Sequence, residues 1–168
     1  KVASSYNNAL QRILNETKKV RRGKFVNYRE NQIGPNRLQP TERSLEFWQK
    51  TGEEQKGDIL IVAVQLGKRH AGKSVRRVRV ICQSTGYEFG LGAFVVGIML
   101  LTHPERLSNH EDLWIDCPGD KYDDPDSGVH FDHFPFWLFN GGEVRFGTGV
   151  VSDVVDNFGS ASAFFPQY

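Results

Sequence analysis

The chain is poor in sulfur-containing residues, with two cysteines and one methionine among 168 residues. Two thiols, Cys82 and Cys117, cannot form the multi-bridge framework that holds a small secreted domain together. We therefore interpret both as reduced thiols and expect a cytoplasmic protein.

Long hydrophobic runs are also missing. The longest apolar stretch, Ala93–Leu101, is interrupted by Gly97 and is about half as long as a membrane-spanning helix. We therefore expect no membrane partner. With 39% hydrophobic and 12% aromatic residues, the chain still has enough apolar material for one packed domain over residues 1–168.

Each half of the chain lacks charge of one sign. Residues 1–80 carry 18 Lys/Arg against 7 Asp/Glu, whereas residues 81–168 carry 3 Lys/Arg against 13 Asp/Glu. Because the halves nearly cancel, the net charge of +1 hides the asymmetry. Such a split indicates a half that faces a polyanion, a half that binds ions, or two halves that neutralise each other.

Hydrophobic periodicity predicts two helices in the basic half. The first carries an apolar face through Leu10 and Leu14 and ends at Gly23, and the second runs from Thr41 to about Gly52. Phe89–Leu101 is apolar throughout and predicts a buried central helix. With the strands described next, the pattern predicts an α+β fold with a mostly antiparallel sheet.

Several segments have the composition of strands. The continuous apolarity of Asp58–Leu66 predicts a central, buried strand, and the alternation within Val75–Cys82 favours a second. Leu113–Asp116 predicts a short strand. Asn-Gly-Gly at 140–142 lies between apolar runs and predicts a hairpin, and the tail from Val150 can add one more strand.

The segment Gly67–Ser74 matches the phosphate-binding loop pattern G-x-x-x-x-G-K-[ST] letter for letter. In such a loop the backbone amides and the lysine hold phosphate groups at the start of a helix. Against this interpretation, Val75–Cys82 alternates like a strand rather than a helix. The favoured alternative is a β-hairpin whose loop and second strand are strongly basic.

A basic ribbon next to a basic helix end is the electrostatic footprint of a protein that contacts a phosphate backbone. The preferred function is therefore binding of DNA or RNA, sensitive to salt and largely independent of base sequence. The residues expected to contact nucleic acid are Lys18, Lys19, Arg21, Arg22, Lys24, Lys68, Arg69, His70, Lys73, Arg76, Arg77 and Arg79.

The acidic segment 116–133 is the second candidate site. Its oxygen donors suit Mg²⁺ or Ca²⁺, and its imidazoles with Cys117 leave zinc as an alternative, although no established ligand pattern is present. A plain turn-rich connection explains the same composition. The candidate metal ligands are Asp116, Asp120, Asp123, Asp124, Asp126, His130 and Asp132.

Two alternative functions follow from these segments. The first is a metal-dependent nuclease or phosphoesterase with Asp116, Asp120 and His130 as candidate catalytic residues. The second is a self-assembling subunit, a homo-oligomer in which basic and acidic surfaces of neighbouring copies pair. The preferred interpretation is a binding protein rather than an enzyme, and Mg²⁺ or Ca²⁺ is the candidate cofactor.

Overall fold

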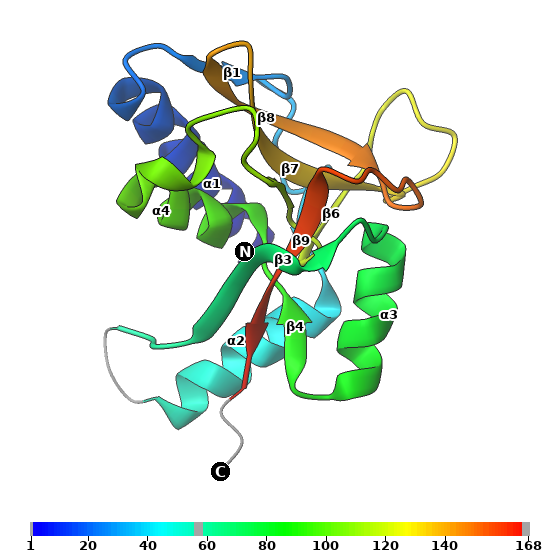
Figure 1. Ribbon diagram of the computed structural model, residues 1–168. Helices are drawn as coiled ribbons and strands as arrows, with labels where there is room; N and C mark the ends of the chain where they lie inside the picture. The colour runs from blue at the N-terminus through cyan, green and yellow to red at the C-terminus, as the bar shows by residue number, and fades with distance from the viewer. Residues whose placement is uncertain (1, 56–58, 166–168) are drawn as a thin grey trace.

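The computed structural model describes residues 2–55 and 59–165 and confirms the α+β class, with four α-helices and a nine-stranded sheet in the described chain (Figure 1). The elements are α1 (Val2–Val20), β1 (Phe25–Asn27), β2 (Leu38–Pro40), α2 (Glu42–Glu54), β3 (Ala63–Ala71), α3 (Val75–Thr85), β4 (Glu88–Gly90), α4 (Ala93–Thr102), a short 3-10 helix (Pro104–Leu107), β5 (Trp114–Asp116), β6 (Asp120–Tyr122), β7 (His133–Asn140), β8 (Glu143–Val150) and β9 (Phe158–Phe164).

The sheet is mixed, which corrects the expectation of a mostly antiparallel one. Its main order is β1-β8-β7-β5-β9-β3, and β1–β8 and β5–β9 pair in parallel. Both parallel pairs join strands that are far apart in the sequence, so no local turn sequence predicts them. The predicted hairpin at 140–142 is confirmed as β7–β8, with positive φ at Gly141 and Gly142.

Strand β9 connects the upper and lower parts of the molecule as drawn in Figure 1. Its first residues, Phe158–Ser160, pair with β5, and its last residues lie between β3 and β4. Helices α1 and α4 lie together beside β7 and β8, whereas α2 and α3 lie with β4 in the lower part of Figure 1. None of the described helices combines the length and apolarity needed to cross a bilayer.

The two predicted N-terminal helices are present as α1 and α2. The helix predicted over Phe89–Leu101 is present as α4 from Ala93 only, because Phe89 and Gly90 belong to strand β4. Leu10 and Leu14 of α1 are buried, and Gly97 of α4 lets α1 approach, because a Cβ there would lie 2.5 Å from Ile13 Cγ2. The carboxylate of Asp120 caps the start of α4, because it accepts a hydrogen bond from the Ala93 amide at 2.7 Å.

The prediction of a strand over residues 75–82 is wrong, because these residues form helix α3. Val75, Val78 and Cys82 are buried on one face, and Val80 is 60% exposed. Local capping explains the outcome, since Ser74 Oγ accepts the Arg77 amide at 3.3 Å and Gly86 ends the helix at φ +75°. The apolar alternation is therefore incidental.

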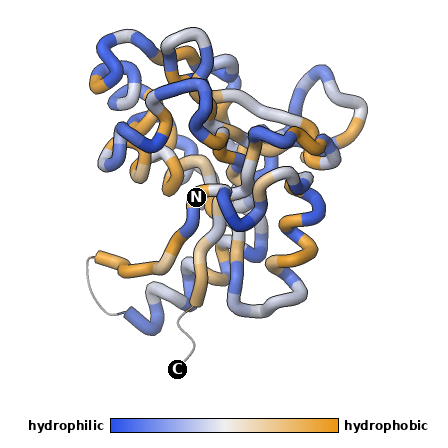
Figure 2. The backbone as a smooth tube through the Cα atoms, in the orientation of Figure 1, coloured by the Kyte–Doolittle hydropathy of each residue, from blue (hydrophilic) through white to orange (hydrophobic). Residues whose placement is uncertain are grey.

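The central, buried strand predicted over Asp58–Leu66 is also corrected. Asp58 lies outside the described residues, and β3 begins at Ala63 at the end of the sheet order. Ile59 and Ile61 are 80% and 78% exposed, and Figure 2 shows this segment as an orange stretch at the lower left. A continuous apolar run cannot by itself distinguish a central from a peripheral segment.

Gly67 has a structural role in the contact between β3 and β9. Its φ is +97°, and a Cβ there would lie 2.6 Å from the carbonyl oxygen of Gly159. Both the positive φ and the backbone contact require glycine at this position.

We expect Gly67→Ala to lower the free energy of unfolding by more than about 2 kcal/mol, through backbone strain and the clash with β9. The matched control is Gly52→Ala in α2, where a Cβ meets nothing within 4 Å. It should raise stability by up to about 1 kcal/mol through helix propensity. Equal effects of the two changes in urea unfolding would refute the role given to Gly67.

Candidate nucleic-acid interface

The resemblance of residues 67–74 to a phosphate-binding loop does not extend to its conformation. Strand β3 occupies most of the segment. The Gly72 amide donates to the Phe158 carbonyl at 3.0 Å, and the Arg76 amide, just after the motif, donates to the Val151 carbonyl at 2.9 Å. These two amides are therefore not available to a phosphate.

The lysine of the same motif is also held by the chain. Lys73 Nζ donates to the carbonyl oxygen of Arg69 at 3.1 Å, and the Lys73 amide donates to that of His70 at 3.3 Å. Ser74 is occupied as the cap of α3. The motif is thus explained by a strand–turn–helix connection rather than by nucleotide binding.

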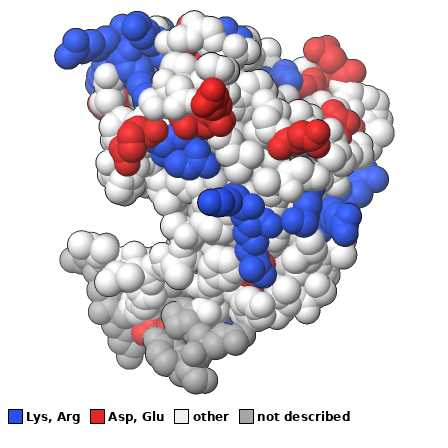
Figure 3. Space-filling model, viewed as in Figure 1, with Lys and Arg blue, Asp and Glu red and all other residues white. Residues whose placement is uncertain are grey.

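The turn nevertheless presents cations to solvent. Lys68, Arg69, Arg76 and Arg77 are exposed, and Lys73 is half-buried. We call these five residues the basic surface. Figure 3 shows Lys and Arg side chains gathered across β3 and the start of α3. Of the five, Arg69 is the one with an ion pair among the described residues, at 3.3 Å from Glu88 Oε2.

The basic surface lies at the N-terminal end of α3, where cations are unfavourable. Lys73 precedes the helix, Arg76 and Arg77 lie in its first turn, and no acidic residue is present in that turn. The helix dipole places partial positive charge at this end, so a negative group there is stabilised and these cations are repelled. Such an arrangement gains stability when an anion binds.

Two residues expected in the interface lie inside the protein instead. His70 is 2% exposed, and its ring points away from the basic surface toward Glu88. Arg79 donates to the carbonyl oxygens of Pro118 and Asp120, at 3.0 and 2.6 Å, and burial lowers its pKa to about 10. Arg79 therefore holds the 117–120 segment against α3.

The second basic group lies at the end of α1. Four of its five cations are exposed, whereas Arg21 is half-buried and donates to the Pro104 carbonyl at 2.8 Å. Figure 3 shows this group at the upper left, apart from the basic surface on the same face. The exposed members are Lys18, Lys19, Arg22 and Lys24.

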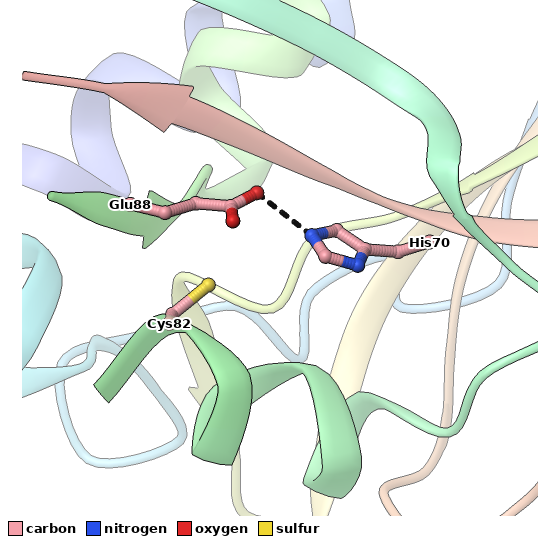
Figure 4. A group of neighbouring side chains, drawn as sticks. All are labelled: His70, Cys82 and Glu88. Carbon is pink, nitrogen blue, oxygen red and sulfur yellow. Dashed lines mark hydrogen bonds and ion pairs between the residues drawn. The ribbon is translucent and has the colours of Figure 1, made fainter. Parts of the chain in front are cut away.

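A buried polar cluster lies next to Arg69 of the basic surface, and Figure 4 shows its three side chains. It consists of His70 from β3, Cys82 from α3 and Glu88 from β4, which are 2%, 2% and 0% exposed. His70 Nε2 hydrogen-bonds Glu88 Oε1 at 2.7 Å, and the hydroxyl of Ser162 in β9 donates to the same oxygen at 2.6 Å. The cluster joins four elements of the lower part of the fold.

Glu88 is kept ionised by its partners. Burial raises the pKa of its carboxyl, but the hydrogen bonds from Ser162 and His70 and the charge of Arg69 outweigh that effect and hold it below its usual value. Cys82 behaves in the opposite way, because burial raises the pKa of its thiol to about 12. A thiol of this kind is not an activated nucleophile.

The acidic segment does not gather its candidate ligands at one point. Asp116 and Asp120 are buried, and burial raises the pKa of each carboxyl to about 7. Asp116 lines a pocket of about 170 Å³ together with Phe134 and Lys73, whereas Asp120 lies against Tyr6, whose hydroxyl donates to it at 2.6 Å.

The remaining acidic candidates form local contacts, and Asp124 and Asp132 share His133 as a partner. His130 is exposed, with Nδ1 at 3.1 Å from both carboxylate oxygens of Asp123. Asp124 is buried and pairs with Arg29, so here a basic-half and an acidic-half residue neutralise each other. Asp132 Oδ1 lies 2.6 Å from His133 Nδ1, and Asp126 is exposed.

Within residues 2–55 and 59–165, the only convergence of three metal-ligand side chains is His70, Cys82 and Glu88, whose ligand atoms lie within 4.8 Å of one another. The metal site in the acidic segment and the hydrolase that depends on it stay predictions. No spacing rule could have found this cluster, because its members are 12 and 6 positions apart and are separated by a turn and a helix. Glu88 beside an apolar run was the one available signal.

Comparisons with known proteins give no further assignment. The chain has no significant match to any family model, to any curated protein or to any solved structure.

The raised pKa of Asp116 makes a prediction about stability and pH. The folded-state pKa of Asp116, about 7, lies above the ordinary 3.8. The contribution of Asp116 to the free energy of unfolding is therefore complete below about pH 4 and is lost as pH rises through 7. Between pH 5 and pH 8 the free energy of unfolding of the unmodified protein should fall by about 2–3 kcal/mol from this cause. We expect this fall to be absent in Asp116→Asn, because asparagine cannot ionise.

Urea unfolding at both pH values measures this effect, and Asp126→Asn at an exposed position is the matched control. The control should show the same loss as the unmodified protein. An unchanged pH dependence in Asp116→Asn would show that Asp116 is ionised in the folded state at pH 5.

Proposed function

We propose that this protein binds nucleic acid through the phosphate backbone and that the basic surface makes the contact. The observation that carries the proposal is the presence of Lys73, Arg76 and Arg77 at the positive end of α3 without an acidic neighbour in its first turn. A bound phosphate relieves their mutual repulsion and their repulsion by the helix dipole.

The exposure of the side chains supports a surface contact rather than a pocket. Arg76 and Arg77 extend from the helix into solvent, and Lys68 and Arg69 extend from the neighbouring strand. Guanidinium groups can bind a phosphate with two parallel hydrogen bonds, which suits arginine at such a contact. The α1 group of Lys18, Lys19, Arg22 and Lys24 extends the same charged face.

The character of the contact follows from its composition. The five residues of the basic surface are cations with long side chains, and such groups contact phosphates more than base edges. We therefore propose binding with little dependence on base sequence, to DNA or RNA, and with strong dependence on salt.

The first test is a salt titration of binding to a fluorescent duplex of arbitrary sequence. We expect Arg76→Ala with Arg77→Ala to weaken binding and to reduce the slope of log K against log salt by about 2, because each phosphate contact contributes about 0.9. The same change should weaken binding to single-stranded RNA.

The matched control is Arg12→Ala with Lys50→Ala, which removes two exposed cations from α1 and α2 outside both basic groups. This variant should retain the original slope. Absence of binding at low salt, or equal slopes for the two double variants, would reject the proposed interface.

A second prediction concerns stability without ligand. Removing Arg76 and Arg77 should raise the free energy of unfolding by about 0.3–1 kcal/mol for each cation, because both oppose the dipole of α3. Arg76→Lys with Arg77→Lys keeps the charge and should leave stability unchanged. Thermal unfolding at low and high salt measures the effect, which screening should reduce at high salt. A loss of stability in the alanine variant would contradict the electrostatic strain described above.

A further inference from the structure

We propose that His70, Cys82 and Glu88 form a zinc site next to Arg69 of the basic surface, a role that does not depend on nucleic-acid binding. The three side chains provide one imidazole nitrogen, one sulfur and one carboxylate oxygen, all within 4.8 Å of one another. Nitrogen, sulfur and carboxylate oxygen are the ligands that zinc takes in proteins. In Figure 4 the three groups point toward a common centre.

The elements that supply the ligands fix them in place. His70 is on β3, Cys82 is near the end of α3 and Glu88 is on β4, directly after the turn that follows α3. All three side chains are almost fully buried, so their positions are determined by packing rather than by solvent-exposed rotamers. A metal bound here would join the C-terminal part of α3 to strands β3 and β4.

One hydrogen-bonded pair of ligand atoms must separate before zinc can bind. Ligand atoms around a tetrahedral zinc ion lie about 3.3 Å or more apart, since each bond is about 2.0–2.3 Å long. His70 Nε2 and Glu88 Oε1 are now 2.7 Å apart, joined by a hydrogen bond, so they must separate by about 0.6 Å. The bound ion takes the position between these two atoms.

The charges of the ligand set suit a buried dication. Thiolate and carboxylate contribute two negative charges and the imidazole is neutral, so the zinc-bound cluster has no net charge. The thiol proton of Cys82 is released to solvent. When Nε2 binds the ion in place of its hydrogen bond to Glu88, the imidazole proton moves to His70 Nδ1, which is buried and has no hydrogen-bond partner among the described residues.

The mixed donor set also defines which metals are excluded. Mg²⁺ and Ca²⁺ require several oxygen ligands, whereas this cluster has one carboxylate. A thiolate and an imidazole instead favour zinc, or cobalt as its spectroscopic substitute. The specificity expected here therefore differs from that of the acidic segment.

The test is titration of purified, metal-stripped protein with Co²⁺, because cobalt bound to a thiolate gives an intense charge-transfer absorption. We expect one Co²⁺ per chain, displaced by Zn²⁺ and not by Mg²⁺ or Ca²⁺. Cys82→Ser should lose the thiolate absorption, whereas Cys117→Ser, which changes the other buried cysteine, should retain it.

A second variant covers the case in which Cys82→Ser does not fold. His70→Gln leaves the thiol in place and should weaken cobalt binding by at least about 100-fold, since even groups that only orient the ligands contribute 10- to 100-fold. The proposal is overturned if the folded unmodified protein shows no thiolate absorption with Co²⁺. It is also overturned if the absorption persists in Cys82→Ser or is lost in folded Cys117→Ser.

Discussion

The carboxylate of Glu88 is the interaction on which the lower part of the structure depends. It is fully buried, and it accepts hydrogen bonds from His70, Ser162 and Arg69. These partners lie on β3 and β9, while Glu88 itself is on β4. A buried charge without such partners would be strongly destabilising, so the position of each strand is determined by the same group.

The buried network lies next to the turn between β3 and α3. His70 is directed inward to Glu88, whereas Lys68 and Arg69 are exposed, in a stretch where the pairing of β3 with β9 shifts register between Leu66 and Ala71. Ser74 caps the start of α3, which places Arg76 and Arg77 in the first helical turn. The basic surface therefore depends on this irregular end of β3 and on the helix cap, and the proposed zinc site uses the contact of His70 with Glu88.

The charge asymmetry of the sequence has two structural outcomes. Part of it is neutralised within the chain, since Arg29 pairs with the buried Asp124 and Arg69 pairs with Glu88. The rest remains exposed, with Lys68, Lys73, Arg76 and Arg77 forming no ion pair among the described residues. The exposed remainder is the part that supports binding of a polyanion.

Local signals predicted local features well. The Asn-Gly-Gly hairpin and the helices α1 and α2 were found because turn residues and helical periodicity are encoded in neighbouring positions, and α4 was found from its continuous apolar run. Helix α3 was missed because Val78, Val80 and Cys82 also fit a strand. Only the caps at Ser74 and Gly86 distinguish the helix from a strand here.

The long-range contacts could not be predicted from the sequence, for a physical reason. The parallel pairing of β5 with β9 and the meeting of His70, Cys82 and Glu88 depend on how distant segments pack, and no spacing rule encodes them. The exposed position of Ile59 and Ile61 likewise depends on where β3 falls in the sheet order.

The most direct test of the central claim is a titration of the isotope-labelled protein with a short duplex, followed by amide and side-chain NMR at low salt. The account predicts that the largest shifts lie at residues 68–77, with smaller shifts at 18–24, and that α2 is unaffected. Shifts concentrated in α2 or in the acidic segment 116–133, or no shifts at all, would contradict it.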